Sequence, residues 1–263
     1  MTVSQDKAAA YALLAWYEAM GVDEAVGEEP RNGFAEASPE LAPARPAPER
    51  AAVANVPRPA PARSEGAPAR LGIGAEVSTL AELEALVAQF EGCSLKRTAK
   101  NLCFARGSLQ AGIMMIGEAP GRDEDLQGKP FVGRAGRLLD RMLASIGLGE
   151  GDVYITNTVY WRPPGNRTPT PEEIEACAPF LARQIELLSP RLLVLLGGAA
   201  AKHVLGVNQG IMRLRGRWLT YTCSIGDVPV LATLHPAYLL RKPEQKRYAW
   251  RDLLMLKAAL DSR

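Results

Sequence analysis

Three features are scarce or missing in this sequence, and each absence excludes a class of protein. Only four cysteines occur among 263 residues, too few for a small disulfide-stapled secreted scaffold. No stretch approaches the roughly 20 consecutive apolar residues that cross a bilayer. The opening residues, MTVSQDKAAA, lack the basic and then apolar regions of a secretory signal. We therefore expect a protein of the reducing cytoplasm.

An excess of charge of either sign is also missing, because the formal net charge is only +2. By itself this value gives little support to a nucleic-acid partner. The balance hides an asymmetry, however. Residues 1–70 contain 7 basic and 10 acidic residues, and the remainder contains 24 basic and 19 acidic residues. The C-terminal part therefore carries a charge of +5, which favours binding of a polyanion such as DNA.

The composition divides the chain into three parts. An N-terminal helical segment at 1–35 is rich in apolar and aromatic residues, and it either docks on the protein's own catalytic domain or tethers a protein partner. Residues 36–75 are rich in alanine and proline, which predicts a disordered, extended linker. Residues 76–263 alternate short apolar runs with amphipathic helices, as is typical of one α/β domain.

Four apolar runs predict a central, mostly parallel four-stranded sheet. They lie at 112–117, 152–157, 191–198 and 228–236, and a hairpin is expected to lead into the last of them. Helices are expected between the runs. The clearest begins with a capping box of Thr170 and Glu173 around Pro171. For the last helix, over 244–260, the expected inward residues are Trp250, Leu253, Leu254 and Leu256.

Polar side chains stand where three of these strands end. Glu118 follows the first strand, Asn157 closes the second, and His235 follows the fourth. Because ligands of parallel sheets bind beyond the carboxyl ends of the strands, these residues form a candidate active site. Each also has an ordinary structural interpretation, as a turn cap, an Asx motif or a structural hydrogen bonder. His203, on a predicted helix, is interpreted as a packing or surface residue.

The loops after these strands add glycines, one aromatic residue and basic residues. The first loop lacks the GKS/T ending of a P-loop and the GxGxxG of a dinucleotide site, so an ATP or NAD site is disfavoured. Phe131 in this loop is either a core residue or a stacking platform for a flat ligand. Basic residues near an apolar segment at 236–241 suit the gripping and wedging of a duplex, and a solvated loop is the alternative.

Four segments, in this order, resemble the motifs of family 4 uracil-DNA glycosylases. They are GEAPGRDED, GKPFVGRAG, YITNTVYWRPPGNRTPTPEE and HPAYLLR, and the resemblance extends from about Cys93 to the C-terminus. It implies a three-layer αβα sandwich around the sheet. It also implies an enzyme that hydrolyses the N-glycosidic bond of a flipped-out deoxyuridine in DNA and so initiates base excision repair. Uracil-containing DNA is then the partner, and a monomer is expected.

The resemblance also implies roles for individual residues. Glu118 would position the attacking water and stabilise the cationic sugar, and His235 would hydrogen-bond uracil O2 as the base leaves. Phe131 would stack on the base, while Asn157 would accept a hydrogen bond from N3–H and donate one to O4. Glu124 matches a further acidic position near the base. The other implied residues are Ala119 in the base pocket and, at the DNA, Gly121, Gly133, Arg134, Arg167, Pro236, Tyr238, Leu240 and Arg241.

Members of the family hold a [4Fe-4S] cluster with four cysteines, and this sequence departs from that pattern. At the four corresponding positions it has Phe90, Cys93, Trp161 and Cys177. Such a cluster ordinarily needs four protein ligands. The remaining cysteines, Cys103 and Cys223, match no family position. We therefore expect a packed hydrophobic patch here and no cofactor.

Two other functions are compatible with the sequence. One is a DNA-binding or partner-recruiting protein that keeps the base pocket with weak catalysis. The other is a glycosylase for another deaminated base, such as hypoxanthine. The presence of Glu118, Phe131, Asn157 and His235 together favours an enzyme, because a protein that only binds has no need of a carboxylate at a glycosidic bond.

Overall fold

The computed structural model describes residues 76–262. These residues belong to the compact unit Pro59–Arg263, and a separate unit comprises Met1–Arg58. The helical segment predicted at 1–35 and the linker predicted at 36–75 lie outside the described residues. The described residues therefore make up the predicted catalytic domain.

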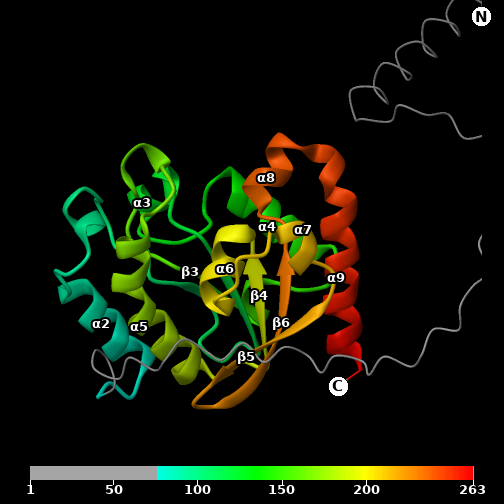
Figure 1. The fold of residues 1–263 in the computed structure, drawn as a ribbon, viewed down its shortest axis with the longest axis horizontal. Helices are drawn as coiled ribbons and strands as arrows, with labels where there is room; N and C mark the ends of the chain where they lie inside the picture. Colours follow the sequence, from blue (N-terminus) through cyan, green and yellow to red (C-terminus); the bar gives the residue numbers. More distant parts are fainter. Residues whose placement is uncertain (1–75, 263) are drawn as a thin grey trace, which may run out of the picture. The chain divides into compact units, whose positions relative to one another are not determined.

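A six-stranded sheet forms the centre of the structure, in the order β1-β3-β2-β4-β6-β5 (Figure 1). Its four inner strands are parallel, as predicted, and are β2 (Ile113–Gly117), β3 (Val153–Asn157), β4 (Leu192–Leu196) and β6 (Gly226–Thr233). Antiparallel β1 (Arg106–Gly107) and β5 (Trp218–Cys223) form the two edges. The sheet is therefore larger than the four strands expected. The expected hairpin adds β5, and β1 is too short to leave a periodic pattern in the sequence.

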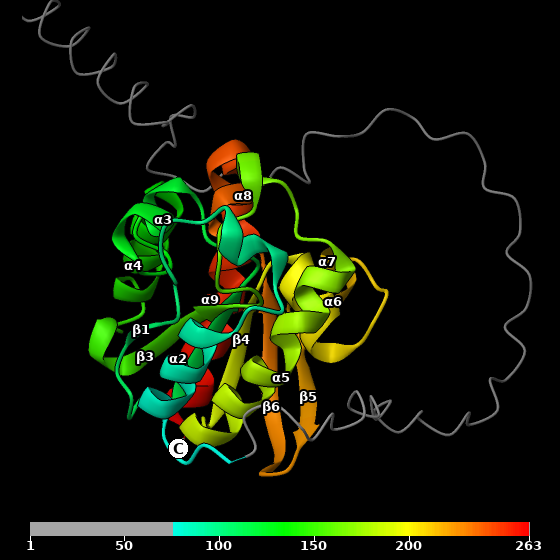
Figure 2. The same ribbon diagram turned by 90° about the vertical axis from the view of Figure 1, so that its left-hand side faces the viewer.

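Helices cover both faces of the sheet, which confirms the predicted three-layer αβα arrangement. On one face, α4 (Arg134–Ala144) and α9 (Lys246–Asp261) pack on the side chains of Ile113 and Met115. On the other, α5 (Pro171–Leu188) and α6 (Gly198–Leu205) pack on Met114 and Ile116. Successive side chains of a strand point to opposite faces, so every residue of β2 is buried. Figure 2 shows the sheet between these two helical layers.

The last helix differs in part from the prediction. Leu253 and Leu256 are buried, but Trp250 and Leu254 are 44% and 45% exposed, so their predicted inward placement is wrong. The inward stripe of α9 is instead Ala249, Asp252, Leu253 and Leu256. Asp252 is buried because its carboxylate binds Thr233 and the guanidinium of Arg215. The ion pair between Asp252 and Arg215 therefore occupies part of the inward face that hydrophobic spacing had assigned to Trp250 and Leu254.

The remaining elements connect these layers. They are α2 (Leu80–Gln89), η1 (Ser94–Arg97), α3 (Arg122–Gln127), η2 (Glu150–Asp152), η3 (Pro164–Asn166), α7 (Ile211–Leu214), α8 (Pro236–Arg241) and η4 (Pro243–Gln245). The predicted helix after Thr170 is confirmed, because Thr170 Oγ1 accepts a hydrogen bond from the backbone N–H of Glu173. Among the helices of residues 76–262, none combines the length and the apolar character that crossing a membrane requires.

Candidate active site

The carboxyl ends of β2 and β3 bring two of the predicted residues together through a glycine. Gly117 ends β2 and lies opposite Asn157, the last residue of β3. A Cβ atom on Gly117 would lie 2.5 Å from Asn157 Oδ1 and 2.5 Å from Phe131 Cζ. The amide and the ring can approach each other only because position 117 carries no side chain. Sequence reasoning missed Gly117, although a glycine that ends an apolar strand is a visible signal.

His235 joins this group from the end of β6. Its ring lies 5.6 Å from the ring of Phe131, centroid to centroid, at an interplanar angle of 34°. On its other side is Gly197, whose φ of 94° is in the left-handed region that favours glycine. A Cβ atom at Gly197 would lie 2.9 Å from His235 Cβ. Phe131 is thus a neighbour of both Asn157 and His235, and it connects the three predicted residues.

Phe131 reaches this position through a strained turn. Its φ is 56°, which is unusual for a residue other than glycine, and the residue is only 5% exposed. A Cβ atom on Gly136 would overlap the Phe131 carbonyl oxygen, so the turn needs glycine there. The ring packs in the core with Met115 and Leu139 and also borders the site. Both interpretations from the sequence, core residue and platform beside a ligand, are compatible with this place.

Asn157 presents an unused hydrogen-bond acceptor. The residue is 1% exposed, and among the described residues its Oδ1 has no hydrogen-bond donor. A buried polar atom without a partner costs about 1–3 kcal/mol, so such atoms are rare in folded proteins. An orphaned acceptor beside an aromatic ring is what a site needs in order to receive a flat ligand with an N–H group.

His235 is held neutral and in one orientation. Its Nδ1 accepts a hydrogen bond of 3.1 Å from the backbone N–H of Ala237, in the first turn of α8. Burial, together with the positive charge of Arg241, lowers the pKa of His235 to about 4. At neutral pH the imidazole is therefore uncharged. Because Nδ1 is the acceptor, the proton is on Nε2, which is then a hydrogen-bond donor.

Glu118 lies at the same edge of the sheet, directly after β2. Thr158 anchors its backbone, because Thr158 Oγ1 donates to the Glu118 carbonyl at 2.7 Å and Thr158 N donates to the Gly117 carbonyl at 2.9 Å. The Glu118 side chain is half-buried. Ala119, the next residue, packs on the apolar cluster beneath α5. The three strand-end residues predicted from the sequence therefore share one edge of the sheet.

Glu124 has a structural role that the sequence did not reveal. Its Oε1 accepts from Gly133 N at 2.8 Å and its Oε2 accepts from Gly121 N at 3.1 Å. Gly121 and Gly133 are the N-caps of α3 and α4, so the carboxylate joins two helix N-termini, where negative charge is favourable. The N–H groups of both glycines are thus already bound within the protein. Arg134, the first residue of α4, is exposed.

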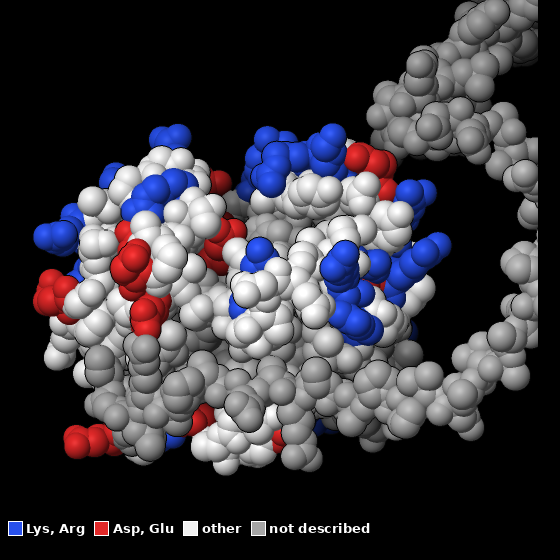
Figure 3. Space-filling view, viewed as in Figure 1, with Lys and Arg blue, Asp and Glu red and all other residues white. Residues whose placement is uncertain are grey.

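The segment 236–241, expected to be a wedge loop, is the short helix α8. Proline suits the first helical position, and His235 caps the helix. Pro236 is buried and Tyr238 is half-buried, whereas Leu240 is 37% exposed and Arg241 is exposed. Figure 3 shows Lys and Arg side chains gathered over α8. An exposed leucine beside positive charge therefore borders the site.

The residues at the four family cluster positions do not fit a [4Fe-4S] cluster. Phe90, Cys93, Trp161 and Cys177 all belong to one apolar cluster. The other two thiols lie elsewhere: Cys103 donates to the Glu124 carbonyl, and Cys223 lies at the end of β5 in the hairpin. In residues 76–262, no three His, Cys, Asp or Glu side chains are grouped so that they could hold a metal ion. The chain thus offers two thiols where four are needed.

Comparison with known proteins identifies the family. The model of the Uracil DNA glycosylase superfamily matches residues 104–254, a range that contains the strand-end residues Glu118, Asn157 and His235 as well as Phe131 and α8. The chain belongs to this superfamily. A type-4 uracil-DNA glycosylase of Archaeoglobus fulgidus is 46% identical over 156 residues, which cover 58% of this chain and 78% of the relative. One of Pyrobaculum aerophilum is 39% identical over 180 residues, 67% of this chain and 92% of the relative.

The chain also matches type-5 uracil-DNA glycosylases, over a smaller share of its length. A type-5 uracil-DNA glycosylase of Thermus thermophilus is 37% identical over 114 residues, which cover 38% of this chain and 52% of the relative. The matches to type-4 proteins extend over more of the chain. The resemblance found in the sequence motifs is therefore confirmed.

Proposed function

We propose that the protein is a uracil-DNA glycosylase, which hydrolyses the bond between uracil and deoxyribose in DNA and so begins base excision repair. The observation that carries this proposal is the buried Oδ1 of Asn157, which finds no hydrogen-bond partner in residues 76–262. It lies beside Phe131, which in turn contacts His235. Membership of the superfamily and the names of its type-4 relatives support it.

Base recognition follows from the hydrogen-bonding pattern of uracil. The flipped-out base stacks on Phe131 and directs its Watson–Crick edge at Asn157. The Asn157 Oδ1 accepts from uracil N3–H, and the Nδ2 group donates to O4. Cytosine has an acceptor at N3 and a donor at N4. A fixed amide would therefore place its acceptor against the N3 acceptor and its donor against the N4 donor, and would reject cytosine. Ala119 lies next to Glu118 and contributes to the wall of the pocket.

The reaction breaks the C1′–N1 bond and forms a bond between C1′ and a water oxygen. The electron pair of the broken bond leaves with uracil, which becomes anionic while the sugar becomes cationic. Glu118 positions the water, accepts its proton and stabilises the sugar by charge. The neutral His235 donates from Nε2 to uracil O2, where negative charge develops. Loss of one such donor costs on the order of 10² to 10³ in rate.

DNA contacts are assigned to the rim of the site. Leu240 is the wedge, flanked by Pro236 and Tyr238, and Arg241 binds phosphate. The other proposed contacts are Arg134, Arg167 and the turns at Gly121 and Gly133, where Glu124 already binds the N–H groups of the two glycines and neighbouring groups would have to face the phosphate. Because most of these interactions are electrostatic, affinity should fall with salt. We further propose that the protein is a monomer located in the cytoplasm and that residues 1–35 bind a protein partner. Glu124 is also proposed to act near the base.

One assay tests this function. Oligonucleotides that contain uracil, hypoxanthine or thymine are incubated with the full chain, and abasic sites are then cleaved with alkali. We expect strand cleavage only at uracil. His235→Ala should lose most of the activity and His203→Ala, at the only other histidine, should keep it. No cleavage at uracil would refute the proposal, and cleavage at hypoxanthine instead would support the alternative glycosylase. DNA binding without any cleavage would support the binding protein.

A further inference from the structure

Three segments that are distant in sequence meet at the first turns of α5. The first runs from Phe90 through η1, the second is the segment after β3 that reaches Trp161, and the third is α5 itself. The ring of Phe90 packs edge-on against Phe180 with a centroid distance of 4.8 Å, and Trp161 packs edge-on against Tyr160 at 6.2 Å. Aromatic rings thus fill the places from which two further cluster ligands would have to reach.

The two remaining thiols contact each other. Cys177 Sγ donates to Cys93 Sγ at 4.0 Å, and the residues are 0% and 1% exposed. Cys93 Sγ also lies 4.0 Å from the backbone carbonyl of Glu173, to which it donates. The thiols are therefore packed against each other and against α5, with apolar neighbours around them.

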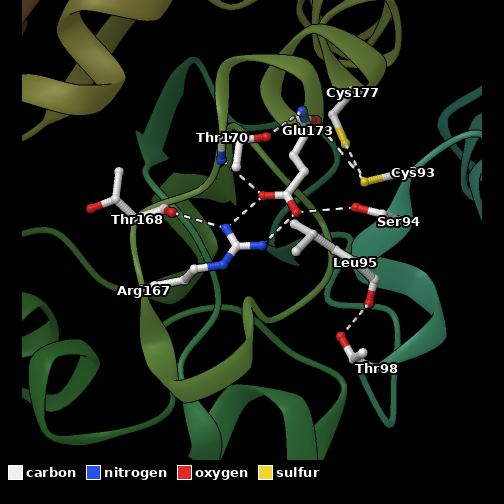
Figure 4. A network of polar contacts seen from close by, with 9 residues as sticks. All are labelled: Cys93, Ser94, Leu95, Thr98, Arg167, Thr168, Thr170, Glu173 and Cys177. Atoms are coloured by element: carbon white, nitrogen blue, oxygen red, sulfur yellow. Dashed lines mark hydrogen bonds and ion pairs between the residues drawn. The ribbon is translucent and has the colours of Figure 1, made fainter.

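A polar network lies directly beside these thiols (Figure 4). We call it the Glu173 network, and it comprises Ser94, Arg167, Thr170 and Glu173. Arg167 binds the Glu173 carboxylate with both terminal guanidinium nitrogens, Nη2 at 2.6 Å and Nη1 at 2.8 Å. Ser94 Oγ donates to the same carboxylate at 3.1 Å, and Thr170 N donates to it at 2.8 Å. One carboxylate therefore joins η1, the loop that follows β3, and the start of α5.

Burial and charge indicate that these contacts are strong. Glu173 is 6% exposed, and the hydrogen bonds from Arg167 lower its pKa to about 2. Bidentate pairs of arginine and carboxylate are among the stronger hydrogen-bonded contacts in proteins. Arg167 is 43% exposed, so water screens part of the attraction. Removal of the arginine would still leave a nearly buried carboxylate with fewer donors.

We propose that the Phe90 and Trp161 rings and the Cys93–Cys177 contact fill the place of an iron–sulfur cluster, that the Glu173 network beside them joins the three segments, and that the protein folds without iron. A cluster bound at the four family positions would necessarily join the same three segments, because its ligands would come from them. Here the network and the apolar packing join them. This inference rests on family membership and on these contacts, and it does not depend on the proposed reaction.

Iron analysis tests the first half of the proposal. The full chain is purified without oxygen, its iron and sulfide are measured, and its absorbance near 400 nm is recorded before and after incubation with ferrous iron and sulfide. We expect less than about 0.1 iron per chain and no absorbance band. About four irons per chain in either sample would overturn the proposal.

A variant with the double substitution Phe90→Cys and Trp161→Cys provides the matched positive control, because it restores the family's ligand set. We expect it to take up iron and gain the absorbance band under conditions in which the wild type does neither. Iron uptake by the wild type under the same conditions overturns the proposal whatever the variant does.

Thermal unfolding tests the second half. Glu173→Gln removes the charge that Arg167 binds, and Glu172→Gln removes an equal charge from the same helical turn at an exposed position. We expect a fall in Tm on the order of 5 °C for Glu173→Gln and little change for Glu172→Gln. Arg167→Ala attacks the same pair from its exposed side and should also lower the Tm. Equal Tm values for both glutamate variants and an unchanged Tm in Arg167→Ala would refute the role of the network. Neither iron content nor Tm measures uracil excision, so failure here is separate from failure of the proposed function.

Discussion

Acid should destabilise this protein through His235 more than through an ordinary histidine. The folded-state pKa is about 4, and the ordinary value is 6.5. Between these values the unfolded chain binds a proton that the folded chain does not. The contribution of His235 to the free energy of unfolding is therefore complete above about pH 6.5. It falls as the pH decreases and levels off near pH 4. At about pH 4.5 this histidine should have cost ~2.5 kcal/mol of the free energy of unfolding.

The assay is urea unfolding of the full chain as wild type and as His235→Gln, at matched pH values from about 7.5 to about 4.5. Glutamine does not titrate, and every other group, including His203, is shared, so the difference between the two proteins isolates His235. The wild type should lose ~2.5 kcal/mol relative to the variant over this range. Parallel pH dependences for the two proteins would refute the assignment of a half-buried, neutral imidazole.

Three further predictions concern the rim and the floor of the site. Gly117→Ala places a methyl group where it overlaps both the Asn157 amide and the Phe131 ring. It should lower kcat/KM for uracil excision by on the order of 10² or more, with an unchanged circular dichroism spectrum. Leu240→Ala should slow excision from duplex DNA more than from single strands, whereas Leu254→Ala, at another exposed leucine, should affect neither. Arg241→Ala should weaken binding and reduce the slope of log affinity against log salt by about 1. The first prediction would be contradicted by a wild-type rate in Gly117→Ala, and the second by equal effects of Leu240→Ala on duplex and single-stranded DNA. An unchanged salt slope in Arg241→Ala would contradict the third.

The sequence predicted the parts of the fold that local patterns determine. Apolar runs indicated the four parallel strands, and the Thr170 capping box indicated α5, because these signals are contained within a few residues. The polar residues at the strand ends were found by topology alone, since parallel strands end at one edge. β1 has only two residues and left no pattern.

Contacts between residues far apart in the sequence could not be predicted from local patterns. Hydrophobic spacing correctly placed Leu253 and Leu256 inward. It also placed Trp250 inward, whereas the buried face of α9 includes Asp252, which pairs with Arg215 and Thr233. Likewise, the sequence assigned Glu124 only to the vicinity of the base. Its bond to Gly133, nine residues away, depends on how two loops approach each other.

Asn157→Asp is the sharpest test of base selection, because one fixed amide is proposed to select uracil by its hydrogen-bonding edge. The measurement compares release of free uracil and free cytosine from matched oligonucleotides by the wild type and the variant. We predict that the wild type releases uracil alone. The variant, which has lost its donor to O4 and gained a second acceptor, should release uracil more slowly and discriminate less against cytosine. A variant that keeps the wild-type rate on uracil and the wild-type rejection of cytosine would contradict the account.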